Sequence, residues 1–218
     1  MFTKTNSAAV CGLECEPIVV EVDLGRGYPG FQIIGLPDTA IQEAKHRIRT
    51  VWRNSGLKFP NGNSILINLA PADIKKEGSA FDLPIAVGIF LSQEKITHNI
   101  NDSIFIGELA LDGNLRHTNG ILPLAIYAAQ AGYKKIFVPS VNAAEASLIS
   151  DIEVYPVENF LQITDHLKGK KLIEKNKPIP IEKWFEYAET EMDMAYIKGQ
   201  EFVKRALEIA ASGAHNIL

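Results

Sequence analysis

The first quarter of the chain passes from strand-like runs to one segment with helical spacing. Pro17–Leu24 and Phe31–Leu36 are apolar and rich in β-branched residues, and the Gly-rich stretch 25–30 between them is typical of a turn. From Ala40 to Asn54 apolar residues recur every three or four positions, which predicts a helix. Its apolar stripe consists of Ile41, Ala44, Ile48, Val51 and Trp52.

The following residues alternate between further strands and helices. Ser64–Ala70 predicts a strand, and Phe81–Ser92 is apolar on all sides, which predicts a buried helix. The pair Asp112-Gly113 predicts a hairpin between Ile104–Leu111 and Asn114–His117. Other predicted elements are strands at Thr3–Ala9, Lys135–Val138 and Glu153–Val157 and helices at Ile121–Gly132, Asn142–Ile149 and Asn159–Leu167. This alternation predicts an α/β (α+β) fold.

A Lys- and Pro-rich stretch, Lys168–Ile181, predicts an exposed linker. We therefore expect a first domain at residues 1–168, a linker at 169–190 and the start of a second domain at 191–218. The last segment has a short loop, an amphipathic helix and a turn before Asn216–Leu218, which resembles the beginning of an apolar strand. Because a strand without a partner seldom closes a domain, we expect the chain to be the front part of a longer protein.

The composition is that of a globular protein and not of a dedicated nucleic-acid module. Hydrophobic residues make up 46% and the net charge is -4. A basic DNA-binding domain would be far more positive, so any contact with DNA must come from a local patch. We find no signal peptide and no run long enough to span a bilayer, and we expect a cytoplasmic protein. We expect Cys11 and Cys15 to be reduced thiols, and we assign no metal site.

Four blocks of the chain point together to one family. They are Val20–Gly56, Ile67–Ile89, Phe105–Ala125 and Ile197–Leu218. In this order they resemble the ComM/YifB family, commonly labelled magnesium-chelatase-like. The resemblance implies a front domain of the ribosomal protein S5 domain 2-like type, similar to the proteolytic domain of Lon and the C-terminal domain of RadA, and then the first elements of an AAA+ P-loop module. It also implies a hexameric, ATP-driven motor that acts on branched DNA in competence and recombination.

The likeness to Lon raises the question of peptidase activity. Lon-type proteases use a serine nucleophile and a lysine base. When the chain is aligned with those motifs, Ala80 takes the nucleophile position, with Ser79 one residue before it, and Leu122 takes the lysine position. An alkyl side chain cannot accept a proton. We therefore expect no catalytic residue here, and we interpret Ser79 as a helix cap or turn residue.

Basic residues at two places are candidates for contacts with DNA or within a ring. Lys45, Arg49 and Arg53 are spaced four apart on the first predicted helix, and Lys75 and Lys76 lie in the charged loop before the second. Each contact with a phosphate adds salt-dependent affinity. The alternative interpretation is a solvated face, which the acidic net charge favours.

Two further charged residues have open interpretations. Arg26, between two glycines, is a candidate for the same basic surface. Asp82 begins an apolar helix, where an acidic side chain interacts favourably with the helix dipole. The alternative for Asp82 is a contact with a neighbouring subunit of a ring.

The nucleotide site that the resemblance implies falls at the end of the chain. Ile197, Lys198, Gly199 and Gln200 resemble the segment that lies over the adenine ring in AAA+ modules. The phosphate loop G-x-x-x-x-G-K-[ST] does not occur in these 218 residues. We therefore expect ATP and Mg²⁺ to act in the full-length protein, and we expect this chain to bind neither and to be inactive alone.

Three functions remain open at this point. The first is an accessory domain of an ATP-dependent DNA motor for helicase or branch-migration work, assembled as a ring. The second is a subunit of a magnesium-chelatase-like ATPase that remodels a protein partner. The third is a Lon-like serine peptidase, which the missing lysine argues against.

Overall fold

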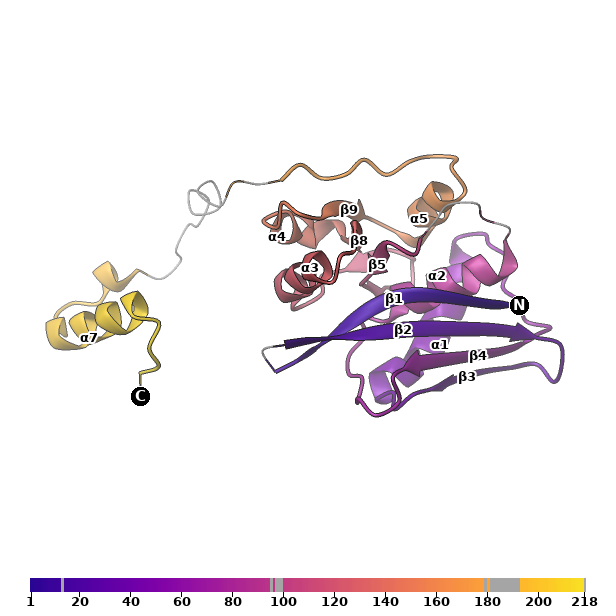
Figure 1. The fold of residues 1–218 in the computed structure, drawn as a ribbon, viewed down its shortest axis with the longest axis horizontal. Coiled ribbons are helices and arrows are strands. Elements are labelled where there is room, and N and C mark those ends of the chain that lie inside the picture. The colour runs from indigo at the N-terminus through magenta and orange to yellow at the C-terminus, as the bar shows by residue number, and fades with distance from the viewer. Residues whose placement is uncertain (13, 95, 97–99, 179, 181–192, 218) are drawn as a thin grey trace. The chain divides into compact units, whose positions relative to one another are not determined.

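The computed structural model describes residues 1–12, 14–94, 96, 100–178, 180 and 193–217. They divide into two units, Met1–Ile179 and Pro180–Leu218 (Figure 1). The strands are β1 (Phe2–Cys11), β2 (Glu14–Gly25), β3 (Gly30–Ile34), β4 (Ser64–Ala70), β5 (Ser103–Phe105), β6 (Glu108–Leu109), β7 (Leu115–Arg116), β8 (Lys135–Pro139) and β9 (Glu153–Val157). The helices are α1 (Thr39–Asn54), α2 (Asp82–Gln93), α3 (Ile121–Gln130), α4 (Ala143–Ala146), α5 (Phe160–Leu167) and α7 (Glu201–Ser212), with 3₁₀ turns η1 (Ser140–Asn142) and η2 (Met194–Tyr196).

One mixed sheet organises the first unit. Its strand order is β3-β4-β2-β1-β5-β8-β9, and β6 and β7 form a separate two-stranded sheet. β1 pairs antiparallel with β2, and β2 pairs antiparallel with β4. The other neighbours in the large sheet pair in parallel, and helices join several of these strands. The predicted α/β class is therefore confirmed.

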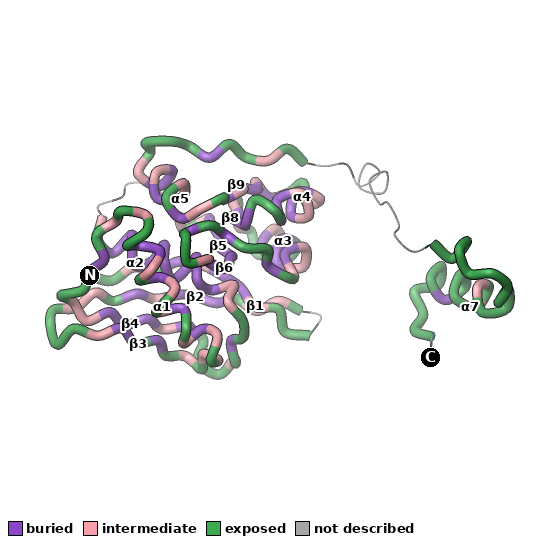
Figure 2. Tube along the Cα trace, turned by 180° about the vertical axis from the view of Figure 1, so that it is seen from behind, coloured by how far each residue is buried: buried purple, intermediate pink, exposed green. Residues whose placement is uncertain are grey.

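Two hydrophobic clusters lie on opposite faces of this sheet. The first contains the buried side chains of α1, α2 and α5, and the second contains those of α3 and α4 (Figure 2). On β8, Phe137 belongs to the first cluster, whereas Ile136 and Val138 belong to the second. Successive side chains of a strand point to opposite faces. This part of the sheet is therefore covered on both sides.

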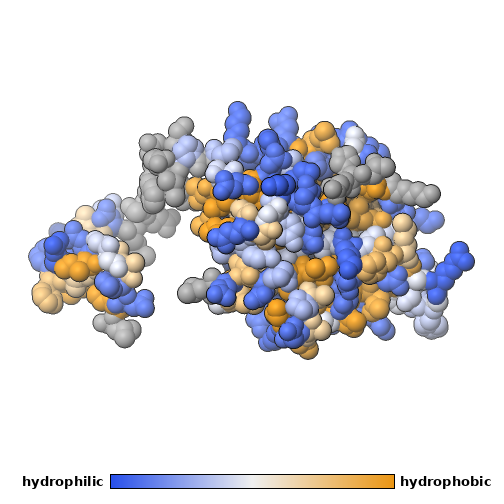
Figure 3. All heavy atoms as spheres, in the orientation of Figure 1, coloured by the Kyte–Doolittle hydropathy of each residue, from blue (hydrophilic) through white to orange (hydrophobic). Residues whose placement is uncertain are grey.

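The half of the sheet formed by β2, β3 and β4 is covered differently. Its inward residues pack against α1 and α2. Gly88 of α2 lies so close to Val22 of β2 that an added Cβ atom would clash with the valine side chain. The outward side chains Gln32, Ile34 and Leu66 are exposed. Figure 3 shows polar and apolar side chains interspersed over the face of the chain that carries these strands. Within the first unit this half therefore has one buried and one exposed face.

The first helix follows the sequence prediction closely. Asp38 caps it, with Oδ1 accepting a hydrogen bond of 2.8 Å from the backbone N–H of Ile41. The predicted apolar stripe is the set of residues that α1 buries. Gly56, which follows the helix, has a φ of +69°, a conformation that glycine adopts without strain. The predicted stripe is therefore buried, and Asp38 and Gly56 fix the two ends of the helix.

Three predicted elements differ in the structure. The segment expected as one arm of a hairpin divides, because β5 enters the large sheet between β1 and β8, and only β6 pairs with β7. Ile104 and Phe105 are fully buried, as is typical of an interior parallel strand. The helix expected at 142–149 shortens to η1 and the single turn α4. Asn216 and Ile217 form no strand, and Leu218 lies outside the described residues.

The chain remains attached to the first unit for some distance after α5. Ile173 is buried, and its N–H donates to Nδ1 of His166 at 2.9 Å. The N–H of Asn176 donates to the carbonyl of Val154 on β9 at 2.7 Å. The first part of the predicted linker 169–190 therefore runs along the edge of the sheet, and its residues 181–190 lie outside the described part of the chain.

No helix among the described residues is long and apolar enough to cross a membrane. Cys11 and Cys15, near the tip of the β1–β2 hairpin, are free thiols. Among the described residues, no three His, Cys, Asp or Glu side chains are grouped so that they could hold a metal ion.

Candidate nucleic-acid interface

The residues that the sequence aligns with the Lon-type catalytic pair make other contacts in the structure. Ala80 lies just before α2, and the hydroxyl of Ser79 donates a hydrogen bond to the Glu108 carboxylate on β6. Leu122, which holds the lysine position, donates its backbone N–H to Glu145 at 3.0 Å. Among the described residues, no hydrogen bond joins Ser79 to a lysine. These contacts fix loops, and they supply no proton acceptor of the Lon type.

Asp82 is held inside the first unit by an arginine that the sequence analysis did not single out. Its carboxylate is 1% exposed and accepts two hydrogen bonds from Arg47 of α1, at 2.6 and 2.9 Å, and one from the N–H of Leu109 at 3.2 Å. Burial raises the pKa of the Asp82 carboxyl, and the Arg47 guanidinium opposes that rise. The interpretation of Asp82 as a contact between subunits is therefore wrong.

A signal for this pair was present in the sequence. Arg47 lies three residues after Ala44 and four before Val51, both on the apolar stripe of α1. A basic residue on a buried stripe needs an acidic partner, because an unpaired buried charge is costly. Asp82, at the start of a fully apolar helix, is the partner that this rule demands.

The two loop lysines lie in different surroundings. Lys75 is exposed and forms an ion pair of 2.6 Å with Glu77. Lys76 is fully buried, and its ammonium donates to the carbonyl of Pro71. Burial lowers the pKa of Lys76. Because a phosphate cannot reach a buried ammonium, we leave Lys76 out of the candidate contacts, and Lys75 is already neutralised by its neighbour.

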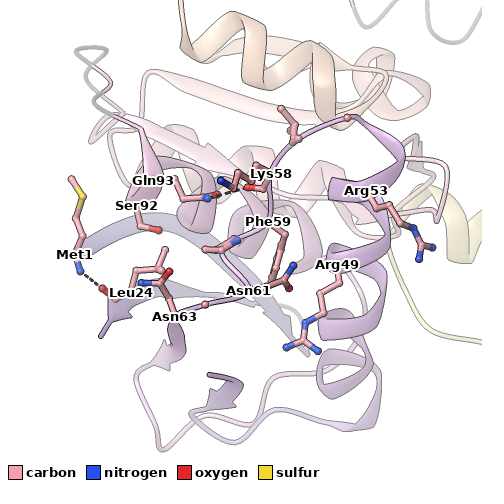
Figure 4. A pocket seen from close by; sticks show the side chains of 14 residues that line it. Met1, Leu24, Arg49, Arg53, Lys58, Phe59, Asn61, Asn63, Ser92 and Gln93 are labelled. Atoms are coloured by element: carbon pink, nitrogen blue, oxygen red, sulfur yellow. Dashed lines mark hydrogen bonds between the residues drawn. The ribbon is translucent and has the colours of Figure 1, made fainter. Parts of the chain in front are cut away.

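The predicted row on α1 leads into a surface hollow of about 1120 Å³ (Figure 4). Arg49 and Arg53 come from the second half of α1, and Lys58 comes from the loop that follows it. Lys45 lies one turn earlier, is half-buried and does not line the hollow, and Arg26 is exposed on the turn before β3. The other lining residues are Met1, Leu24, Gly56, Leu57, Phe59, Pro60, Asn61, Gly62, Asn63, Ser92 and Gln93.

The hollow is positively charged. None of its lining residues is Asp or Glu, although the whole chain has more acidic than basic residues. Arg49, Arg53 and Lys58 are exposed, and none of them forms an ion pair with a described carboxylate. Arg53 lies in the last turn of α1, where its charge interacts favourably with the helix dipole. That structural role does not account for Arg49 or Lys58.

Aromatic rings hold Arg49 in place. Its guanidinium carbon lies 5.6 Å from the ring centre of Phe31 and 5.8 Å from that of Phe59, within the range of a cation–π interaction. Phe59 in turn packs edge-on against Trp52 of α1, with ring centres 5.6 Å apart. The positive charge at this wall of the hollow is therefore positioned before any ligand arrives.

The residues predicted to lie over an adenine ring belong to the second unit. Ile197, Lys198, Gly199 and Gln200 form an exposed loop directly before α7. Gly199 has a φ of +72° and Gln200 a φ of +59°, so the chain turns sharply into the helix. The loop presents backbone and one apolar side chain, which fits the predicted type of contact, and its role in nucleotide binding stays a prediction.

Comparison with known proteins places the chain among magnesium-chelatase-like proteins. The family described as subunit ChlI of Mg-chelatase matches residues 20–142, and a second one, magnesium chelatase, subunit ChlI, matches residues 193–218. The competence protein ComM of Haemophilus influenzae is 38% identical over 214 residues, 97% of this chain and 42% of that protein. The YifB protein of Salmonella typhimurium is 39% identical over 98% of this chain and 41% of its own length.

A more distant relative supports the likeness to Lon. Lon protease 2 of Bacillus subtilis is 32% identical over 136 residues, which is 62% of this chain and 24% of that protease. The chain thus spans about two fifths of the ComM and YifB proteins that it matches. With one matched family covering more than half of its residues and ComM and YifB similar over nearly all of them, the chain belongs to the magnesium-chelatase-like ComM/YifB family.

Proposed function

We propose that the chain is the front part of an ATP-dependent DNA motor, and that its first unit contacts DNA through the hollow beside α1. The observation that carries this proposal is the set of Arg49, Arg53 and Lys58 around a recess without a lining carboxylate. Unneutralised basic side chains are the general means by which proteins bind phosphodiester backbones. The similarity to a competence protein gives such a surface a use in handling DNA.

The second unit supplies the start of the motor in this proposal. Ile197–Gln200 would lie over the adenine of ATP. A further part of the full-length protein, which corresponds to the region of the longer relatives that this chain does not span, would hold the phosphates and Mg²⁺. We further propose a ring of subunits, with six as the expected number, working in the cytoplasm. Within such a ring the first unit gives the DNA a fixed, positively charged contact while the ATPase parts move.

The observations favour the DNA motor over the two alternative functions. A subunit that remodels a protein partner has no evident use for a concentrated positive recess in an acidic chain. A Lon-type peptidase requires a lysine beside a serine, whereas Leu122 holds that position and Ser79 contacts Glu108.

The experiment that tests the proposal is ATP hydrolysis by the full-length protein with and without forked DNA. We expect the fork to raise the hydrolysis rate several-fold. A polyanion without bases, such as inorganic polyphosphate, is the matched control, because it separates DNA from bulk negative charge. A rate that is indifferent to DNA contradicts the proposal, and stimulation by a protein partner instead would support the remodelling function.

A further inference from the structure

We infer that the hollow beside α1 takes single-stranded DNA, with one base stacked on the guanidinium plane of Arg49. This inference rests on the proposed function, because it specifies the form of DNA that the same hollow binds. Three features of the lining carry it: a fixed planar cation, amide side chains with free acceptors, and a recessed shape.

The planar cation is Arg49. Its guanidinium carbon lies 5.6 Å from the ring centre of Phe31 and 5.8 Å from that of Phe59, and both phenylalanines are at least nine-tenths buried. The Arg49 side chain itself is exposed. Proteins that bind single strands stack unpaired bases on aromatic rings or on arginine planes. An arginine that rests on two buried rings offers such a plane at little cost in side-chain entropy.

The amide side chains are those of Asn61, Asn63 and Gln93. Gln93 donates its Nε2 to the carbonyl of Lys58 at 3.1 Å, and Asn63 donates its Nδ2 to the carbonyl of Gly25 at 3.4 Å. These bonds leave the side-chain carbonyl oxygens of both residues as acceptors for the amino groups of a base. The Watson–Crick edges that would supply such donors are occupied in a duplex and free in a single strand.

The shape of the site also favours a single strand. Proteins that read duplex DNA insert a protruding helix or ribbon into the major groove. Here Arg49, Arg53 and Lys58 line a recess between the end of α1, the loop 56–63 and the end of α2 (Figure 4). A recess with basic walls accepts a strand narrower than itself, as in channels that bind single strands. In this arrangement Arg53 and Lys58 contact phosphates, and Arg49 receives a base.

The test measures binding of the 218-residue chain to labelled DNA by fluorescence anisotropy. The ligands are an oligodeoxythymidylate, a hairpin duplex with the same number of phosphates, and an abasic strand of the same length. We expect the single strand to bind about tenfold more tightly than the duplex. We expect the abasic strand to bind about five- to tenfold more weakly than the strand with bases, because stacking is lost.

The discriminating substitution is Arg49→Lys, with Arg53→Lys as the matched control. Both keep the positive charge, but a lysine at position 49 lacks the planar surface. Arg49→Lys should weaken binding of the single strand about five- to tenfold and leave binding of the abasic strand unchanged. Arg53→Lys should change neither by more than about twofold, because a phosphate accepts either cation.

Two results overturn the inference: equal affinity for duplex and single strand, or equal affinity of the wild-type chain for the abasic strand and the strand with bases. Neither measurement depends on whether a variant folds. If these results occur while forked DNA still stimulates ATP hydrolysis by the full-length protein, the motor function stands and only the single-strand site is wrong. If hydrolysis ignores DNA while the chain binds single strands as expected, the proposed motor function is wrong.

Discussion

Two arginines of the same helix meet opposite surroundings. Arg47 turns inward and forms two hydrogen bonds with the buried Asp82. Arg49, two residues later, lies against Phe31 and Phe59 at the edge of a hollow, with no described carboxylate to pair with it. The difference teaches that a basic residue becomes available to a ligand only where the fold provides no acidic partner and leaves the charge at the surface.

The adjacent lysines of the loop before α2 extend this comparison. Lys76 is buried and serves the loop, and Lys75 is exposed but paired with Glu77. Neither satisfies both conditions that Arg49, Arg53 and Lys58 satisfy. Of the basic residues that the sequence offered as candidates, Arg49 and Arg53 meet both conditions and line the hollow, whereas Arg26 meets them but does not line it.

We expect the largest effect from a change in the buried pair of Arg47 and Asp82, and this effect is on stability. Asp82→Asn removes the charge that neutralises Arg47 while keeping the size of the side chain. Breaking one half of a buried pair leaves Arg47 with only the exposed carboxylate of Glu43, 3.8 Å away, so we expect the free energy of unfolding to fall by about 3 kcal/mol. Urea unfolding followed by circular dichroism measures this loss.

The double substitution Asp82→Leu with Arg47→Met is the control for this prediction. It removes both charges together and replaces them with apolar side chains of similar size, so it should recover most of the lost stability. A stability of Asp82→Asn within about 0.5 kcal/mol of the wild type would show that the pair contributes little, since substitutions at sites without special interactions have effects of that size. In that case Arg47 could not be distinguished from Arg49 by a role in stabilising the fold.

Part of this architecture could be predicted from the sequence, for identifiable physical reasons. The stripe and cap of α1 are local patterns, and the buried character of α2 follows from its apolar composition. The place of β5 was missed because a three-residue strand carries little pattern and its partners β1 and β8 are distant in sequence. The α1–Phe31–Phe59 contact was missed for the same reason, since it joins three separate segments.

We expect a change among the exposed basic residues of the hollow to alter the affinity for DNA. Arg53→Glu should lower the affinity of the chain for single-stranded DNA at low salt by about tenfold, because it removes one phosphate contact and adds a repulsive charge. It should also reduce the steepness of the salt dependence by about 0.7 in the logarithmic slope. Anisotropy titrations at several salt concentrations measure both quantities.

Lys75→Glu is the matched control, because it changes the net charge by the same amount at a site away from the hollow. We expect its affinity for DNA to stay within about twofold of the wild type at moderate salt, where charges farther away than a Debye length are screened. Equal losses in the two variants would mean that DNA responds to net charge and not to the hollow.

We expect the smallest effect, on the pH dependence of stability, at the partly exposed cluster of Tyr155, Glu153 and Lys175. Tyr155 donates a hydrogen bond of 3.0 Å to Glu153, which also pairs with Lys175 at 2.6 Å. Burial, and then the Glu153 carboxylate, raise the pKa of Tyr155 to about 12. Between pH 10 and about pH 12 the unfolded chain loses this phenol proton while the folded chain keeps it, so stability should fall as the pH rises through that range.

Tyr155→Phe keeps the ring against Phe137 and removes the proton. Its unfolding free energy should therefore fall less steeply over this pH range, and it should differ from that of the wild type by less than about 1 kcal/mol at neutral pH. Urea unfolding of both chains across this pH range measures the difference, and parallel curves would show that the cluster at the surface does not hold the phenol in its protonated form.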